Sequence, residues 1–219
     1  YSDLAITTVL VIKRVFRLTL RAAQGFIDSI FTLMNVPLRC PDYTSVSKRA
    51  KSVNVSFKTS TRGEIAHLVI DSTGLKVFGE GEWKVRKHGK ERRRIWRKLH
   101  LAVDSNTHEV VCADLSLNNV TDSEAFPGLI RQTHRKTTAA SADGAYDTRL
   151  CHDELRRKKI SALIPPRKGA GYWPGEYADR NRAVANQRLT GSNARWKWTT
   201  DYNRRSIAET AMYRVKQLF

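Results

Sequence analysis

The sequence predicts an α/β fold, in which a mixed five-stranded sheet is flanked by helices and preceded by an all-helical N-terminal domain. Residues 1 to about 56 carry apolar side chains at helical spacing. From about residue 64 the pattern changes to short apolar runs typical of buried strands. The elements predicted from there follow the order β-β-β-α-β-α-β-α. We therefore expect one domain over residues 1–56 and a second over residues 64–219.

The N-terminal domain is predicted to begin with two helices. Ser2 is suited to cap a helix that runs to about Phe16, and a second helix covers residues 18–34. Pro37 and Pro41 then interrupt the helical pattern.

A short third helix is expected over residues 43–51, with Asp42 as its cap. Its polar face offers hydroxyl groups and the basic residues Lys48 and Arg49, which suit a DNA groove. We interpret the three helices as a helix-turn-helix-like DNA-binding domain. The spacing is generic, and a helical packing domain without a DNA-binding role fits it about as well.

Three strands are predicted to open the second domain. The first passes through the apolar residues 67–70 to Asp71 and continues to residue 77. The next two cover residues 99–103 and 109–112, with Asp104 in the turn between them. We interpret Asp104 as a turn residue and leave it out of the functional site.

The remaining elements alternate between helix and strand. They are predicted, in chain order, at residues 121–129, 138–142, 147–159 and 160–164. Thr121 and Glu124 form a capping box for the first of these helices, and Asp147 is placed to cap the second. Residues 167–201 follow as a basic insertion that contains glycine and tryptophan.

The last predicted helix begins at residue 202 and places four polar side chains on one side. At about 100° per residue these side chains fall within about 60° of one another. They are Tyr202, Arg205, Glu209 and Lys216. The opposite side is apolar and can be buried, so the helix can present Glu209 toward a site.

Two aspartates stand at comparable positions in the predicted sheet. Asp71 follows an apolar run, and Asp143 ends the strand at 138–142 just before Gly144. Because burying ionised carboxylates without partners is costly, these two acids and Glu209 indicate a shared cation. Three carboxylates with no cysteine or histidine cluster suit Mg²⁺, for which Mn²⁺ can substitute.

At this point the residues match a known family. The chain resembles the DDE transposases of bacterial insertion sequences, whose last motif reads Tyr-x2-Arg-x3-Glu-x6-Lys. The four polar residues of the last helix match that motif at every position. Ile70-Asp71-Ser72-Thr73-Gly74 and Ala142-Asp143-Gly144-Ala145-Tyr146 extend the resemblance over nearly the whole chain. It implies a catalytic core similar to ribonuclease H and retroviral integrase, and the predicted element order agrees with that core.

The resemblance implies that Asp71, Asp143 and Glu209 form a catalytic, metal-binding triad. It also implies DNA contacts by the other signature residues, Tyr202, Arg205 and Lys216. Bound Mg²⁺ would activate water to cut the phosphodiester at the element's terminal inverted repeats, and the freed 3′-hydroxyl would attack target DNA. The expected partners are double-stranded DNA and further copies of the chain, since paired ends suggest a homodimer or higher assembly. Residues 1–56 would recognise the repeats.

The charge of the chain agrees with a nucleic-acid partner. Lys and Arg total 39 against 21 acids, which gives a net charge of +18 and favours polyanions. The densest basic run, residues 84–98, is too charged for a core. We interpret it as a segment that binds DNA phosphates; the alternative is a solvated hairpin tip without a binding role. The candidate DNA contacts in it are Arg86, Lys87, Arg93 and Arg94.

The composition favours a cytoplasmic protein that is nucleoid-associated when bound to DNA. The three cysteines have no metal-ligand spacing and indicate a reduced compartment. The apolar run at residues 4–12 is far shorter than the roughly 20 residues of a membrane span, and it lacks the features of a secretory signal. We therefore expect no membrane partner.

Other residues are interpreted as structural. Three histidines adjoin apolar runs and are expected to be satisfied within the fold: His67, His100 and His152. Four aromatic residues of the insertion are suited either to stack on unpaired bases or to pack a small core, and we expect most of them to be core. They are Tyr172, Trp173, Trp196 and Trp198.

Several other functional classes share part of this pattern. A ribonuclease H-like nuclease or Holliday-junction resolvase would use the acids without recognising terminal repeats, and a DNA-binding regulator would not need the triad. A tyrosine or serine recombinase would need a protein nucleophile, and we assign that role to neither Ser72 nor Tyr202. Because the chain runs from Tyr1 to Phe219, inside an amphipathic helix, we also expect a fragment that binds metal but transfers strands weakly or not at all.

Overall fold

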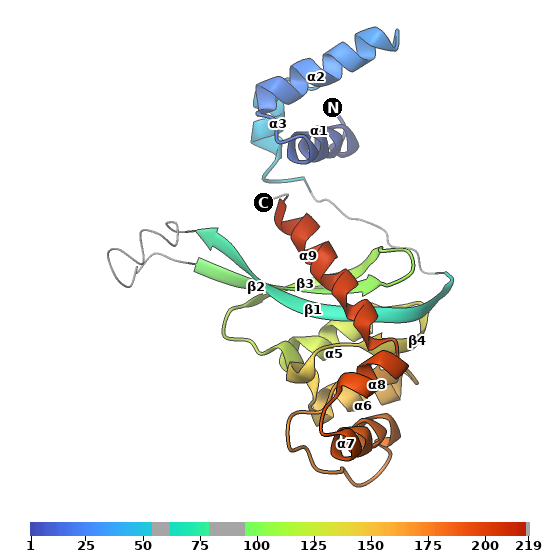
Figure 1. Cartoon of the computed structure of the whole chain (residues 1–219). Coiled ribbons are helices and arrows are strands. Elements are labelled where there is room, and N and C mark those ends of the chain that lie inside the picture. Colours follow the sequence, from blue (N-terminus) through green and yellow to red (C-terminus); the bar gives the residue numbers. More distant parts are fainter. Residues whose placement is uncertain (54–61, 79–94, 218–219) are drawn as a thin grey trace. The chain divides into compact units, whose positions relative to one another are not determined.

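The computed structural model describes residues 1–53, 62–78 and 95–217 (Figure 1). The chain divides into two compact units, Tyr1–Lys58 with Val215–Phe219 and Thr59–Arg214. Each unit has a hydrophobic core of its own. Most of the predicted boundary between residues 56 and 64 lies outside the described residues.

Three helices make up the described part of the N-terminal segment: α1 (Asp3–Val15), α2 (Leu20–Leu33) and α3 (Tyr43–Arg49). The predicted caps of α1 and α3 are confirmed, because Ser2 accepts from the Ala5 backbone N–H and Asp42 from that of Thr44. Thr19 caps α2 by accepting from the Ala22 N–H, which the sequence analysis missed. The helices pack around a small core of Ile6, Val9, Ala23, Ile27, Cys40 and Val46.

A five-stranded mixed sheet forms the centre of the second unit, as predicted. Its strands are β1 (Glu64–Phe78), β2 (Ile95–Asp104), β3 (Val110–Leu117), β4 (Lys136–Ser141) and β5 (Ser161–Leu163). They are arranged in the order β3-β2-β1-β4-β5. The first three strands are antiparallel, whereas β4 runs parallel to β1 and β5 runs parallel to β4. This is the expected ribonuclease H-like arrangement.

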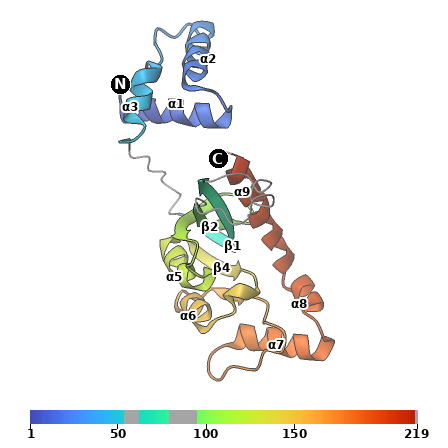
Figure 2. The same cartoon turned by 90° about the vertical axis from the view of Figure 1, so that its left-hand side faces the viewer.

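Helices cover both faces of this sheet. On one face lie α5 (Asp122–Gln132) and α6 (Arg149–Arg157), whose side chains join those of β1, β2, β3 and β4 in the main core. The other face is crossed by α9 (Ser206–Gln217), which follows a 3-10 turn, η2 (Tyr202–Arg205) (Figures 1 and 2). A second 3-10 turn, η1 (Gly144–Tyr146), follows β4.

Two further helices lie inside the predicted insertion at residues 167–201. They are α7 (Ala178–Thr190) and α8 (Ala194–Thr199), and the sequence analysis predicted neither. The polar sequence of α7 buries only Arg180, Ala183 and Val184, so it shows no clear apolar stripe.

The last predicted helix is confirmed only in part. Residues 202–205 form a 3-10 turn, and only the residues from Ser206 onward are α-helical. Side chains three residues apart eclipse in a 3-10 turn, so Tyr202 and Arg205 still lie on one side of it, but the signature residues differ in exposure. Tyr202 is buried, whereas Glu209 and Lys216 are exposed.

The roles predicted for two acids outside the triad have different outcomes. Asp104 accepts from the Asn106 backbone N–H, which confirms it as a turn residue. Asp147 was expected to cap α6, and this is wrong: the cap is Thr148, whose hydroxyl accepts from the Cys151 N–H. The Asp147 carboxylate is buried and binds Arg180 instead.

The three histidines are structural, as expected. His67 lies 3.0 Å from the Ser141 hydroxyl, His100 lies 2.8 Å from that of Ser116, and His152 lies 3.2 Å from Asp147. Burial lowers the pKa of both His67 and His100, which favours the neutral imidazole.

The expectation that most insertion aromatics are core is wrong for two of the four. Trp196 is 4% exposed and Trp173 is half-buried, but Tyr172 is 51% and Trp198 is 79% exposed. The two tryptophans of α8 are two residues apart and therefore point to nearly opposite sides of the helix, so only one of them faces the core. Among the described residues, none of the helices combines the length and apolar character that crossing a bilayer requires.

Candidate active site

The pairing of β1 with β4 places Asp71 and Asp143 at matched positions. Val69 pairs with Ser141 across these parallel strands, and each aspartate lies two residues beyond that pair. Asp71 is still within β1, whereas Asp143 has left β4 and caps η1, its Oδ1 accepting from the Ala145 backbone N–H at 2.9 Å. Strand register therefore brings the two acids to neighbouring positions where β4 ends beside β1.

Arg205 connects Asp71 to the third acid. Its Nη1 lies 3.6 Å from Asp71 Oδ2, and its Nη2 lies 3.6 Å from Glu209 Oε1. The Asp71 side chain is 15% exposed and that of Glu209 is 66% exposed. One acid of the sheet and one acid of α9 thus share a single guanidinium.

The charges of the other two acids act on Asp71. Burial is the largest effect and raises the pKa of Asp71, and the charges of Asp143 and Glu209 raise it further. Arg205 and the Ser72 backbone N–H oppose this rise. Carboxylates that repel in this way favour a bound cation, because a cation removes the repulsion.

Tyr202 lies beside the same acids but is 7% exposed and packs against Trp196, with ring centroids 5.6 Å apart. Burial raises the pKa of Tyr202 to about 12, and the charges of Asp143, Asp71 and Glu209 act in the same direction. The tyrosine therefore borders the three acids from inside the fold, and its contact with DNA stays a prediction.

The donor set of the triad is suitable for a hard divalent cation. All three side chains offer carboxylate oxygens, the ligands that Mg²⁺ prefers. Within the parts of the chain that the structure describes, no three His, Cys, Asp or Glu side chains lie close enough together to hold a metal ion as they stand. The fit is therefore one of ligand chemistry and charge, with Arg205 as the positive group between Asp71 and Glu209.

The other predicted DNA contacts have different surroundings. Lys48 on α3 and Lys216 on α9 are exposed. Arg49 is half-buried and binds the Asp3 carboxylate and the Tyr1 carbonyl. Four residues lie outside the described residues: Arg86, Lys87, Arg93 and Arg94.

A buried network behind Asp143 was missed by the sequence analysis. Arg180 donates to both oxygens of Asp147, from Nε at 2.8 Å and from Nη2 at 3.2 Å. Trp173 stacks on the Arg180 guanidinium, 3.6 Å from it to the ring centroid. Arg167 donates to the carbonyl oxygens of Gly144 and of the next residue in η1. The insertion thus holds the turn that carries Asp143, and nothing in the sequence pattern pairs Asp147 with a partner 33 residues away.

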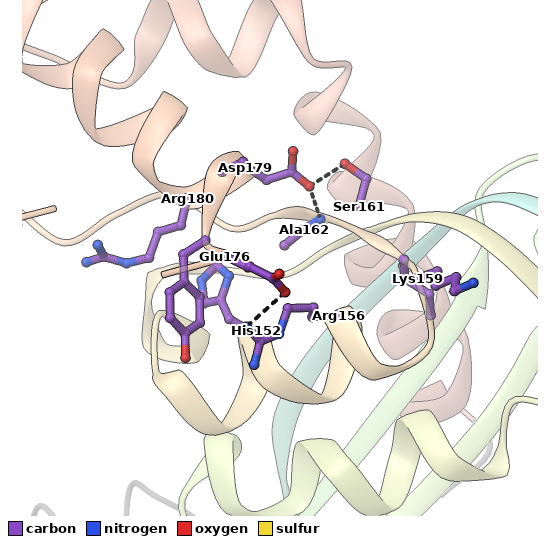
Figure 3. A pocket seen from close by; sticks show the side chains of 11 residues that line it. His152, Arg156, Lys159, Ser161, Ala162, Glu176, Asp179 and Arg180 are labelled. Carbon is purple, nitrogen blue, oxygen red and sulfur yellow. Dashed lines mark hydrogen bonds and ion pairs between the residues drawn. The ribbon is translucent and has the colours of Figure 1, made fainter. Parts of the chain in front are cut away.

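A cavity of about 410 Å³ lies apart from the triad, between α6, β5 and the start of α7 (Figure 3). Asp179 closes one side of it by accepting from the Ser161 hydroxyl at 2.8 Å and the Ala162 backbone N–H at 3.1 Å. Figure 3 shows Arg156 and Glu176 on the opposite side, where they form an ion pair at 3.6 Å. None of its lining residues belongs to the triad, so this cavity is not the candidate active site.

Comparison with known families agrees with the geometry at the sheet edge. A family model described as "Transposase DDE domain" matches residues 62–219, a range that includes Asp71, Asp143 and Glu209. A second model with the same description matches residues 1–80. Because the first match covers more than half of the sequence, the chain belongs to the transposase DDE domain family.

Proposed function

We propose that this chain is a transposase that cuts DNA at the terminal inverted repeats of an insertion sequence and joins the freed ends to target DNA. The observation that carries this proposal is the pairing of both Asp71 and Glu209 with Arg205, with Asp143 at the matched position beyond the neighbouring strand. Family membership supports a transposition enzyme that acts on DNA, and domains of this family generally use divalent metal ions.

We assign Asp71, Asp143 and Glu209 as the ligands of Mg²⁺, or of Mn²⁺ in its place. Asp71 and Asp143 are held by the sheet, and Glu209 stands on an exposed part of α9 that substrate can reach. A bound ion would supply positive charge that polarises the scissile phosphate and lowers the pKa of an attacking water. No protein nucleophile is required, so neither Ser72 nor Tyr202 is assigned a covalent role.

Arg205 is the group best suited to exchange its contacts with the acids for contacts with a DNA phosphate. Its planar guanidinium is shaped to bind two phosphate oxygens at once. In this structure it lies 3.6 Å from both Asp71 and Glu209 and neutralises their charges. A bound cation would take over that neutralisation, and the guanidinium would then be available to orient the phosphate.

Recognition of the element ends is assigned to the helices of residues 1–56, with Lys48 as an exposed candidate contact on α3. Lys216 and the basic run at residues 84–98 are assigned to backbone phosphates. The net charge of +18 supports this division, because phosphate contacts supply affinity whereas base contacts supply specificity. We further propose a cytoplasmic protein that associates with the nucleoid and acts as a dimer or higher assembly.

The proposal is tested with labelled DNA that carries candidate inverted repeats, incubated with the chain and Mg²⁺ or Mn²⁺. We expect nicking at the repeat end and strand transfer into target DNA. Asp71→Asn, Asp143→Asn and Glu209→Gln should each lower the rate by more than about 100-fold, the upper end of what loss of a mere outer-shell group costs. DNA binding should remain. Glu176→Gln, which removes an exposed acid away from the triad, is the matched control.

Each alternative class gives a different result in this assay. Cleavage that depends on the triad but ignores the repeats would indicate a nuclease or resolvase. DNA binding with no cleavage by the parent chain would indicate a regulator or a truncated transposase. Full activity in any one triad variant would remove that acid from the assignment.

A further inference from the structure

Arg167 contacts the turn η1 through both its side chain and its backbone. Its Nε donates to the Gly144 carbonyl at 3.3 Å, and its Nη2 donates to the Ala145 carbonyl at 3.4 Å. Its backbone N–H donates at 3.3 Å to Oδ2 of Asp147, the residue that follows η1. Arg167 is exposed, so this placement does not come from burial in the core.

One peptide group joins Arg167 to the carboxylate of Asp143. The Gly144 carbonyl that accepts from Arg167 Nε belongs to the same peptide group as the Ala145 N–H, and that N–H donates to Asp143 Oδ1 at 2.9 Å. The C=O and N–H of a trans peptide point to opposite sides, so the guanidinium and the carboxylate lie on either side of one planar unit. Hydrogen bonds in such a chain polarise and strengthen one another. The charged donor at the carbonyl therefore makes the N–H a better donor to Asp143.

The second contact of the guanidinium fixes this peptide group more firmly. A guanidinium is a planar fork of donors, so it can hold the consecutive carbonyls of Gly144 and Ala145 in a fixed relation, whereas a lysine ammonium lacks the fork. Asp143 lies beyond the last residue of β4, so strand pairing does not orient its side chain. A group that orients the peptide thereby orients the carboxylate.

We propose that Arg167 is a positioning residue whose guanidinium fork acts through the Gly144–Ala145 peptide group and holds the Asp143 carboxylate in the orientation that binds the metal ion. This inference rests on the proposed function, since it needs Asp143 to be a metal ligand. Hydrogen bonds behind a ligand orient it, and their loss typically weakens metal binding by about 10–100-fold.

The charge of Arg167 and its hydrogen bonds have opposite effects on a bound cation. Removing a positive charge near the site reduces repulsion, so a purely electrostatic role predicts tighter metal binding. Removing the hydrogen bonds frees the peptide group and the carboxylate, so a positioning role predicts weaker metal binding. The direction in which the Kd changes therefore separates the two roles.

The test is Arg167→Met, which keeps an aliphatic side chain and removes the charge and the donors. Binding of Mn²⁺ alone is measured by calorimetry on the full chain without DNA, so a contact of Arg167 with phosphates does not contribute. We expect the Kd for Mn²⁺ to rise about 10–100-fold. An unchanged or lower Kd would overturn the proposal.

Arg188→Met is the matched control for this change. Arg188 also lies in the insertion and also donates to a backbone carbonyl, that of Ala170 at 3.5 Å, but it makes no hydrogen bond to η1 within the described part of the chain. Its replacement should leave the Kd for Mn²⁺ unchanged. An equal rise in Kd for Arg188→Met and Arg167→Met would overturn the proposal, because the effect would then not depend on the contacts with η1.

Two further measurements separate positioning from a general structural role. Arg167→Lys keeps the charge and one donor site without the fork, so its Kd should rise by less than that of Arg167→Met; a Kd equal to that of the parent would overturn the proposal. The DNA cleavage rate of Arg167→Met should fall at low Mn²⁺ and recover once Mn²⁺ exceeds the raised Kd. A rate that stays low at saturating Mn²⁺ would overturn the proposal too. If Arg167→Met does not fold, Arg167→Lys decides the question.

Failure of this proposal is distinguishable from failure of the proposed function. If the parent chain binds Mn²⁺ and Asp143→Asn abolishes that binding, the assignment of Asp143 as a ligand stands. Equal binding by the parent and by Arg167→Met would then overturn the role of Arg167 alone. Parent binding that Asp143→Asn does not affect, or no binding by the parent, would overturn the ligand assignment and this proposal with it.

Discussion

Arg205 lies 3.6 Å from Asp71, measured from Nη1 to Oδ2, so a cation of the chain itself lies against an acid of the triad whose side chain is 15% exposed. The same Nη1 atom is buried without a hydrogen-bond partner in the described part of the chain. The contact is thus an electrostatic one at longer range than a hydrogen bond. Such a pair neutralises charge without fixing the guanidinium in place. This suits a group that, on the proposed function, moves from the acids to the DNA phosphate.

Arg205→Gln should strengthen metal binding while weakening catalysis. Removing a cation that competes for Asp71 and Glu209 should lower the Kd for Mn²⁺ by about tenfold, or about 1.4 kcal/mol. The DNA cleavage rate should fall, since phosphate orientation is lost. Arg204→Gln is the matched control, because Arg204 donates to the Asn106 side chain instead. Unchanged or weaker Mn²⁺ binding by Arg205→Gln would contradict the competition.

Arg180→Met should destabilise the fold in a pH-dependent way. Burial alone raises the pKa of Asp147, but hydrogen bonds from His152 and Arg180 and the charge of Arg180 more than offset it, so the pKa lies below its usual value. The parent carboxylate therefore stabilises the fold above about pH 4, and this contribution is lost as the pH falls through the lowered pKa.

Without Arg180, burial dominates and the pKa of Asp147 rises. We expect a loss of about 3–5 kcal/mol in the free energy of unfolding at pH 7 and a smaller loss at pH 5, where a protonated carboxyl needs no cation. Urea unfolding at both pH values measures this. Arg182→Met, at an exposed arginine 3.9 Å from Asp179, should change stability by less than about 0.5 kcal/mol. Equal losses at pH 5 and pH 7 for Arg180→Met would show that the Asp147 charge is not the cause.

The basic run at residues 84–98 should contribute to DNA affinity through counterion release. Replacing Arg86, Lys87, Arg93 and Arg94 together by alanine should make the slope of log K against log salt shallower by up to about 3.6, at about 0.9 per phosphate contact. The affinity should fall equally on repeat and unrelated duplexes. Binding titrations over a range of salt concentrations check this. An unchanged slope would mean that these residues do not contact phosphates.

The two tryptophans of α8 should differ sharply in their effect on stability. Trp196 is 4% exposed, so Trp196→Ala should cost about 3–5 kcal/mol in the free energy of unfolding. Trp198 is 79% exposed, so Trp198→Ala should change it by less than about 0.5 kcal/mol. Thermal or urea unfolding of both variants makes the comparison. A large loss for Trp198→Ala would show that this side chain has a packing partner.

Much of the sheet could be predicted because the local sequence pattern indicates which residues of each strand are buried. The apolar run before Asp71 and the small residues before Asp143 each indicate a buried stretch of strand that leads to an acid. The register that pairs Val69 with Ser141 has no local signal, so the closeness of these acids was inferred from the cost of burying unpaired carboxylates and from the family resemblance. The contact of Arg205 with Asp71 likewise joins residues that only the fold brings together.

The errors have a common physical origin. Asp147 looked like a helix cap because local spacing was the only information, whereas Arg180 contacts it from another helix. Tyr202 was placed on an ideal α-helix, although the backbone there forms a 3-10 turn packed on Trp196. In each case a distant packing partner overrode the local pattern.

On the proposed function, the placement of Glu209 on α9, which is the last helix of the chain that the structure describes, has a consequence for when the chain can cut DNA during its synthesis. Domains fold as units and the N-terminal one first, so the helices of residues 1–53, which have a core of their own, can fold before α9 has been made. On the proposed function, a nascent chain can hold DNA before it can cut it. A messenger RNA that ended before the codons of α9 would encode a protein that binds the ends of the element without cutting them. Such a protein would block full-length copies from binding and moving the element.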